Sequence, residues 1–172
     1  PKLATGEWFG AYCLTEPEAG SDANSGKTKA VLSDDGKYYA ISGQKMWITN
    51  GGFADVFTVF FFFFEDENLS AFIVEKSFGG ISLNPEEHKM GIKGSSTRQV
   101  FFNDCKVPVE NLLSERGNGF KIAVNILNIG RIKLAAAAIG ASKRVVDHSV
   151  IYANERQQFG RSLSKYGAIK YK

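Results

Sequence analysis

The sequence predicts an α+β fold, in which an antiparallel β-barrel or sandwich is followed by one long helix. Two patterns lead to this prediction. The first two thirds of the chain carry short apolar and β-branched segments between turn residues, and the last third carries a long apolar segment with helical spacing. The composition, with 44% hydrophobic and 23% charged residues, is typical of a globular protein.

The predicted strands are bounded by Gly, Asn, Asp and Pro residues, and no helical pattern separates them. They are Phe9–Leu14, Lys27–Leu32, Tyr38–Trp47, Val56–Phe64, Ser70–Val74 and Gln99–Phe102. Several short strands without intervening helices indicate an antiparallel sheet. Polar turns at Ser33–Lys37 and Glu65–Asn68 link neighbouring strands, so we expect strands that follow one another in the chain to pair.

The fourth of these segments ends in five consecutive phenylalanines, Phe60 to Phe64. Because successive side chains point to opposite faces of a strand, both faces must be apolar here. A strand buried on both faces accounts for the run, and so does an error in the sequence. An exposed run of this kind would promote aggregation.

The helical segment runs from Phe120 to about Gln158, with Gly130 and Gly140 as weak interruptions. At 1.5 Å per residue this is a helix of about 58 Å. Its apolar stripe needs other helices to cover it. After Gly160 a further helix begins, and the sequence reaches Lys172 within it. We therefore expect this chain to be a fragment of a larger protein.

Charge and composition exclude several classes of function. The net charge is +3, and no cluster of Lys and Arg suggests nucleic-acid binding. The longest apolar run, Val56–Phe64, is well below the roughly 18 residues of a membrane-spanning helix, so we expect no membrane association. We find no signal peptide in this segment. Cys13 and Cys105 lack the spacing of redox or zinc motifs, and we expect buried, reduced thiols.

Most catalytic motifs are absent from the sequence. The two histidines, His88 and His148, are isolated, and surface positions explain them better than a metal site. The chain contains no glycine-rich dinucleotide loop, no P-loop and no nucleophile elbow.

Two segments combine hydroxyls, aromatic rings and tight turns at strand ends. In Tyr12–Asp22, a strand leads into a Pro/Gly turn whose hydroxyls and backbone N–H groups suit a pyrophosphate or ring carbonyls. In Lys45–Gly52, the indole of Trp47 and the hydroxyl of Thr49 lie two residues apart on one strand face, which suits a planar heterocycle. Taken singly, each segment is explained equally well as a structural turn.

Tyr12–Asp22 resembles the YCxTEPxAGSD signature of the acyl-CoA dehydrogenases, and Lys45–Gly52 resembles that family's KxWITNG segment. Three further stretches agree in order and spacing, and the resemblance covers nearly the whole chain. They are Met90–Thr97, Val107–Leu113 and Glu155–Gly160.

The resemblance implies a flavoenzyme with three domains: an N-terminal helical domain, a middle β-barrel, and a C-terminal four-helix bundle through which subunits form a homodimer or homotetramer. In this chain, residues 1–8 would end the first domain. Residues 9–114 would form the β-barrel that binds flavin and acyl-CoA. Residues 115–172 would begin the C-terminal domain, which is truncated here.

The resemblance also assigns roles to individual residues. FAD would be bound by Tyr12, Leu14, Thr15 and Ser21 from the first segment and by Trp47, Ile48 and Thr49 from the second. From a neighbouring subunit it would be bound by Arg156, Gln158 and Phe159. A guanidinium such as that of Arg156 forks onto phosphate oxygens, although without the resemblance a solvated cation at a helix end would be the preferred explanation. Acyl-CoA would contact Ser21, Asn128 and Arg131.

The implied reaction is the α,β-dehydrogenation of acyl-CoA thioesters to trans-2-enoyl-CoA in fatty acid β-oxidation, with electrons passed to an electron-transferring flavoprotein. The catalytic base of the family is a glutamate. At its minority position this chain has Gly130, so we expect the base beyond Lys172 and expect the fragment alone to be inactive.

Asn125–Arg131 and Arg161–Ser164 are most similar to the very-long-chain branch of the family. Two alternatives remain open, namely a relative of the acyl-CoA oxidases and a flavin-free assembly module. The expected location is the cytoplasm of a bacterium or the mitochondrial matrix of a eukaryote.

Overall fold

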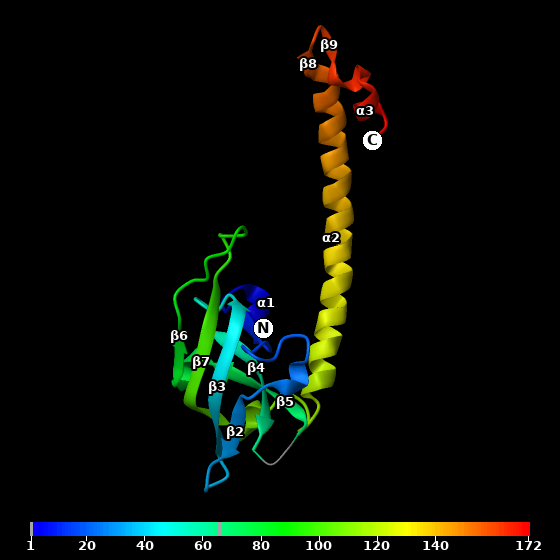
Figure 1. Cartoon of the computed structure of the whole chain (residues 1–172). Helices are drawn as coiled ribbons and strands as arrows, with labels where there is room; N and C mark the ends of the chain where they lie inside the picture. Colours follow the sequence, from blue (N-terminus) through cyan, green and yellow to red (C-terminus); the bar gives the residue numbers. More distant parts are fainter. Residues whose placement is uncertain (1, 65–66) are drawn as a thin grey trace. The chain divides into compact units, whose positions relative to one another are not determined.

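The computed structural model describes residues 2–64 and 67–172 (Figure 1). Contacts between residues divide the chain into two compact units, Pro1–Val124 and Asn125–Lys172, each of which is described by itself. The division falls inside the long helix, beyond the boundary at residue 114 that the sequence suggests.

The first unit is a curved sheet of seven strands, preceded by a short helix, α1 (Lys2–Thr5) (Figure 1). Its strands are β1 (Gly10–Cys13), β2 (Lys29–Leu32), β3 (Tyr38–Thr49), β4 (Val56–Phe63), β5 (Leu69–Glu75), β6 (Ile81–Leu83) and β7 (Thr97–Pro108). Short 3-10 helices lie at Ala23–Ser25, Lys76–Phe78 and Val109–Asn111. The structure confirms the α+β class and the six predicted strands, and adds β6.

Strand pairing only partly follows the expected antiparallel, sequential order. The hairpins β2–β3 and β4–β5 are antiparallel as predicted, but β1 and β2 both run parallel to β4. β1 pairs with Val56–Val59 and β2 with Phe62–Phe63, and β5 pairs with β4 as well. The expected pairing of consecutive strands was wrong for β1 and β2, because residues 14–28 form a long connection rather than a hairpin. It was also wrong for β3 and β4, since β3 pairs with β2 and β7 instead. The predicted turn at Glu65–Asn68 lies partly outside the described residues.

The phenylalanine run is explained by a strand that is buried on both faces. Phe61 and Phe63 belong to one apolar cluster, and Phe60 and Phe62 belong to another on the opposite face. Phe61 stacks on Phe72 of β5 with a centroid distance of 4.8 Å. Phe60 to Phe63 are all less than 5% exposed, whereas Phe64, beyond the strand, is exposed. This is the doubly buried strand that the sequence analysis gave as one explanation of the run.

Both cysteines lie in the larger of these two clusters as free thiols, as expected. Burial raises the pKa of Cys13 to about 12 and that of Cys105 to about 11. Neither thiol is therefore a nucleophile at neutral pH.

The long helix, α2 (Gly119–Glu155), begins against the sheet. A Cβ on Gly119 would lie 2.7 Å from the carbonyl oxygen of Leu69, so only glycine fits this contact. The N–H of Gly117 donates to Oγ of Ser70 at 2.8 Å, and Ala123 is buried in the same cluster as Phe60. The helix ends at Glu155, three residues earlier than expected, because a hairpin of β8 (Gln157–Gln158) and β9 (Arg161–Ser162) follows.

The second unit contains the rest of α2, that hairpin, a 3-10 turn at Leu163–Lys165 and α3 (Gly167–Lys170). Its helical side chains are mostly exposed, for example Ile132 and Leu134 at 72% each. An 18-residue window of α2 has a mean hydropathy of 1.5, enough to cross a membrane by length and composition. The sequence analysis expected no membrane segment because it counted only unbroken apolar runs and not the mean hydropathy of a longer window. One such helix does not establish a membrane span, because helices that pack in soluble bundles meet the same criterion.

Candidate functional site

The two segments singled out in the sequence lie side by side in the first unit. The N–H of Met46 in β3 donates to the carbonyl of Thr15, just after β1, at 2.9 Å. The ammonium of Lys45 donates to the carbonyl of Leu14 at 3.2 Å. One of these bonds joins two backbones and the other joins a lysine side chain to a backbone, so residues about thirty positions apart are linked twice. The two segments that the resemblance assigns to one flavin thus lie together.

Trp47 and Thr49 are exposed, as a wall for a planar ligand requires, and Trp47 is 60% exposed. Trp47 and Thr49 are exposed with Ile48 buried between them, as strand alternation predicts. Lys45 departs from this alternation, because a register shift against β7 lies between Lys45 and Ile48. Trp47 itself adopts a φ of 56°, in the left-handed region that bulky residues rarely occupy. The side chain of Ile48 is 2% exposed and lies in the core, so only its backbone is available for a ligand.

From the first segment, Leu14 and Thr15 are half-buried and Ser21 is exposed. Tyr12 packs its ring on Phe60 at a centroid distance of 5.0 Å. Its hydroxyl is buried without a hydrogen-bond partner within the described part of the chain, and burial raises the pKa of Tyr12 to about 12. A buried hydroxyl without a partner indicates a place where a ligand atom or water would complete the bonding.

A buried ion pair lies directly behind these segments, and the sequence did not predict it. The ammonium of Lys45 lies 2.6 Å from Oε1 of Glu16, and their side chains are 2% and 6% exposed. Burial opposes ionisation of Glu16, but the Lys45 charge and several hydrogen bonds hold the pKa of Glu16 below its ordinary value. The available sequence signal was a lysine inside a predicted strand, because lysine is almost never buried unless it is paired.

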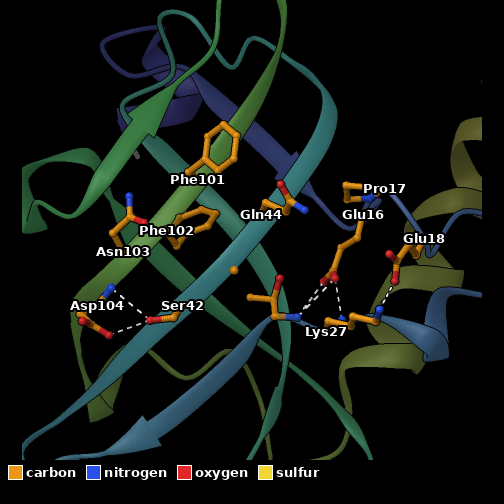
Figure 2. Close-up of a pocket in the computed structure, with 12 residues that line it drawn as sticks. Glu16, Pro17, Glu18, Lys27, Ser42, Gln44, Phe101, Phe102, Asn103 and Asp104 are labelled. Carbon is orange, nitrogen blue, oxygen red and sulfur yellow. Dashed lines mark hydrogen bonds and ion pairs between the residues drawn. The ribbon is translucent and has the colours of Figure 1, made fainter.

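Glu16 also borders a pocket of about 450 Å³, shown in Figure 2. In Figure 2, Glu16 and the exposed ion pair of Lys27 and Glu18 lie on the right side of the pocket. Ser42 and Asp104 lie on its left side. The remaining lining residues are Pro17, Thr28, Gly43, Gln44, Phe101, Phe102 and Asn103. None of the predicted cofactor residues lines this pocket.

A second polar network, also not predicted, braces the turn after Trp47. Glu86 accepts hydrogen bonds from Oγ of Ser96 at 2.7 Å, Nε of Arg98 at 2.7 Å and the N–H of Thr97 at 2.9 Å. The same Ser96 hydroxyl accepts from the N–H of Gly52 at 3.0 Å. These donors, with Arg98 first, lower the pKa of Glu86 to about 2. The loop Met90–Thr97 is thereby tied to the Lys45–Gly52 segment.

The remaining predicted residues belong to the second unit. Nη1 of Arg131 donates to Oδ1 of Asn128 at 2.8 Å, one turn apart on the exposed face of α2. Gln158 and Phe159 lie at the tip of the β8–β9 hairpin. Phe159 has a φ of 50° and is 94% exposed. The hairpin is held by a hydrogen bond from the hydroxyl of Tyr166 to the carbonyl of Gln158 and by the N–H of Leu163, which donates to the carbonyl of Arg156.

Among the described residues, no group of three or more His, Cys, Asp or Glu side chains is arranged to hold a metal ion. His88 and His148 are exposed, in agreement with the sequence-based interpretation.

Comparison with known proteins decides the family. The model of the acyl-CoA dehydrogenase middle domain matches residues 11–105, and that of the acyl-CoA dehydrogenase C-terminal domain matches residues 117–172. This chain belongs to the acyl-CoA dehydrogenase family. The resemblance seen in the five motifs is therefore confirmed, and α2 is part of the family's C-terminal domain.

Individual relatives cover the chain end to end. It is 54% identical over 172 residues to a probable acyl-CoA dehydrogenase of Bacillus subtilis. It is 49% identical over 180 residues to the mitochondrial very long-chain specific acyl-CoA dehydrogenase of Homo sapiens. All of this chain is covered in both, but only 29% and 28% of the two relatives. The chain therefore spans less than a third of the length of these relatives.

The solved structures agree with the sequence comparison. A crystal structure of an acyl-CoA dehydrogenase complexed with FAD from Bacillus anthracis has a TM-score of 0.94 and 53% identity to this chain. It covers 99% of this chain, which in turn covers 29% of that protein. The flavoprotein class predicted from the sequence is thus the class to which its relatives belong.

The residues present fit a flavin. The indole of Trp47 and the hydroxyls of Thr15 and Thr49 lie on two segments that a backbone hydrogen bond joins. The buried hydroxyl of Tyr12, on β1, lacks a partner within the described residues. Aromatic faces and hydroxyl donors are the groups that bind a planar, hydrogen-bonding ring system.

Proposed function

We propose that this chain is part of an FAD-dependent acyl-CoA dehydrogenase that converts acyl-CoA thioesters to trans-2-enoyl-CoA in fatty acid β-oxidation. The observation that carries the proposal is the hydrogen bond from Met46 to Thr15, which joins the two flavin-type segments. Family membership adds the chemistry, because the two segments carry the YCxTEPxAGSD and KxWITNG patterns that the sequence analysis matched to this family.

The residues divide the binding of FAD between them. Trp47 supplies an aromatic wall, and the hydroxyls of Thr15 and Thr49 supply hydrogen-bond donors for a flavin ring. Arg156 supplies a planar cation for pyrophosphate, and the strained, exposed Phe159 supplies a second aromatic surface from a neighbouring subunit. The chemistry that these residues would hold in place is hydride acceptance, which a bound FAD would supply for the β-hydrogen of the acyl group.

Acyl-CoA recognition is proposed for Ser21, Asn128 and Arg131. The bond between Asn128 and Arg131 supports this role for the pair, because the amide holds the guanidinium in one orientation. The removal of the α-proton needs a carboxylate base, and Gly130 offers none. We propose that the base is a glutamate beyond Lys172 and that residues 1–172 alone do not turn over substrate.

The proposed electron acceptor is an electron-transferring flavoprotein, and the proposed assembly is a homodimer or homotetramer formed through the C-terminal helices. The exposed apolar residues of α2 favour such an assembly, because large apolar surfaces are rarely left in water. The identity to a very long-chain specific relative supports long acyl chains as substrates.

The test is an anaerobic titration of the intact protein with acyl-CoA thioesters of increasing chain length. We expect the visible flavin band to bleach and 2-enoyl-CoA to form, with the strongest response for long chains. A protein that binds no flavin, or whose flavin is not reduced by any acyl-CoA, contradicts the proposal. Rapid reoxidation by oxygen without an electron-transferring flavoprotein would instead identify an oxidase.

A further inference from the structure

Lys45 is a charged residue placed in the interior of the first unit. It is 1% exposed, and its ammonium donates to Oε1 of Glu16 at 2.6 Å and to the carbonyl of Leu14 at 3.2 Å. A buried ammonium is costly unless it is paired and hydrogen-bonded, and these contacts meet both conditions. Lys45 therefore links β3 to the turn that follows β1.

The carboxylate of Glu16 extends this link to β2. It accepts from the N–H of Lys27 at 2.5 Å and from the N–H of Thr28 at 3.2 and 3.3 Å. Lys27 and Thr28 lead directly into β2. A single ion pair thus connects three segments that are far apart in the sequence.

The position of Lys45 also bears on the geometry of Trp47. Lys45 and Ile48 are both buried although they are three residues apart, and the register shift between them accommodates this spacing. Trp47 lies between these two anchors, exposed and at a φ of 56°. A residue in such a conformation persists only where the surrounding structure enforces it.

Stability alone does not account for the pair. Replacing a buried ion pair with neutral residues of similar volume often leaves a protein as stable as before, whereas removing one partner is strongly destabilising. Apolar side chains join neighbouring strands elsewhere in this sheet, for example Phe61 of β4 and Phe72 of β5. A charged pair at this point therefore calls for an explanation in terms of geometry.

We propose that Lys45 and Glu16 form a positioning pair, which holds Leu14–Thr15 and Trp47–Thr49 in the register that a flavin requires without contacting the flavin itself. This inference rests on the proposed function. Glu16 adjoins one flavin segment and Lys45 adjoins the other, so the ion pair sets the separation of the two.

The test compares three variants of the intact holoenzyme: Lys45→Met, Glu16→Gln, and the double variant Lys45→Met/Glu16→Gln. Glutamine keeps a carbonyl that accepts from the N–H groups of Lys27 and Thr28, and methionine fills the space of the lysine stem. The matched control is Lys2→Met/Glu7→Gln, which makes the same changes in an exposed pair with an N–O distance of 3.9 Å. For each protein, the thermal midpoint, the Kd of the apoprotein for FAD and the visible circular dichroism of bound flavin are measured.

We expect Lys45→Met alone to lower the thermal midpoint, because a buried carboxylate loses its partner. We expect the double variant to regain the midpoint while its Kd for FAD rises by roughly tenfold or more, since small displacements of binding groups have effects of this size. Its flavin circular dichroism should change as well. The control should match the unsubstituted protein in all three measurements.

A double variant with the original midpoint, Kd and circular dichroism would overturn the positioning role. If the double variant does not fold, Glu16→Gln decides, because it leaves Lys45 in place: a folded Glu16→Gln protein with unchanged Kd and circular dichroism also overturns the proposal. The unsubstituted protein is measured first. If it binds no FAD, the proposed function fails, and the positioning role fails with it.

Discussion

The two units of this chain bury their apolar residues to very different extents. In the first unit, β4 alone buries Phe60 to Phe63 on two opposite faces. In the second unit, α2 carries residues such as Ile132, Leu134 and Ile139 that are each more than 60% exposed. Hydrophobic burial thus stabilises the first unit within these 172 residues, whereas the second requires surfaces from other helices or subunits.

The largest expected effect contrasts one core residue with one helix residue. Phe61→Ala should lower the free energy of unfolding of the first unit by about 3–5 kcal/mol, because it removes a stacked, buried ring. Leu134→Ala in these 172 residues should change stability by no more than about 0.5 kcal/mol. Chemical denaturation, followed by circular dichroism, measures both. A large effect of Leu134→Ala in this chain would show that the second unit is already packed.

Two glycines of α2 make the same comparison within one helix. Gly119→Ala should cost about 1–3 kcal/mol, since the new Cβ would lie 2.7 Å from backbone atoms of β5. Gly130→Ala has open space around it and should stabilise the helix by up to about 1 kcal/mol. The thermal midpoints of the two variants should move in opposite directions. Equal shifts of the two midpoints would contradict the difference in packing between Gly119 and Gly130.

The buried ion pair gives the first unit a pH dependence that exposed pairs do not share. The fold lowers the pKa of Glu16 below the value of about 4.3 that glutamate has in an unfolded chain. Ionised Glu16 therefore stabilises the folded protein fully above that pH, and this stabilisation is lost as the pH falls through the pKa of Glu16 in the folded protein. The thermal midpoint of Glu16→Gln should therefore be below that of the unsubstituted protein at pH 7 and approach it in acid. Glu7→Gln, at an exposed pair, should show no such convergence.

The smallest expected effect concerns Phe159 in the second unit. Asparagine tolerates positive φ better than phenylalanine, so Phe159→Asn should stabilise the β8–β9 hairpin by up to about 1 kcal/mol. In the intact protein the same change should weaken FAD binding. Amide hydrogen exchange of the hairpin and a fluorescence titration with FAD test the two parts. A hairpin that is destabilised would show that the ring is packed rather than presented.

The sequence predicted the strands and the long helix because each depends on local patterns. Turn residues bound the strands, and the resemblance to the family singled out Thr15 and Trp47 as candidates for flavin binding. The sequence did not predict that β1 and β2 run parallel to β4, because that pairing joins strands that no tight turn connects.

The contacts that support the site were missed for a similar reason. Lys45 is buried against Glu16 because the register of β3 against β7 shifts between Lys45 and Ile48, and simple strand alternation does not predict such a shift. The network of Glu86, Ser96 and Arg98 depends on a loop folding back on the turn at Gly52, which no local pattern encodes.

The most direct test of this account is the visible absorption spectrum of the intact protein, recorded after incubation with FAD and desalting, with Trp47→Ala as the comparison. The account predicts a retained flavin band whose shape differs from that of free FAD and a weaker or altered band in Trp47→Ala. A colourless intact protein would contradict the flavin site and favour a flavin-free module. A band that is identical in the two proteins would contradict the role of Trp47.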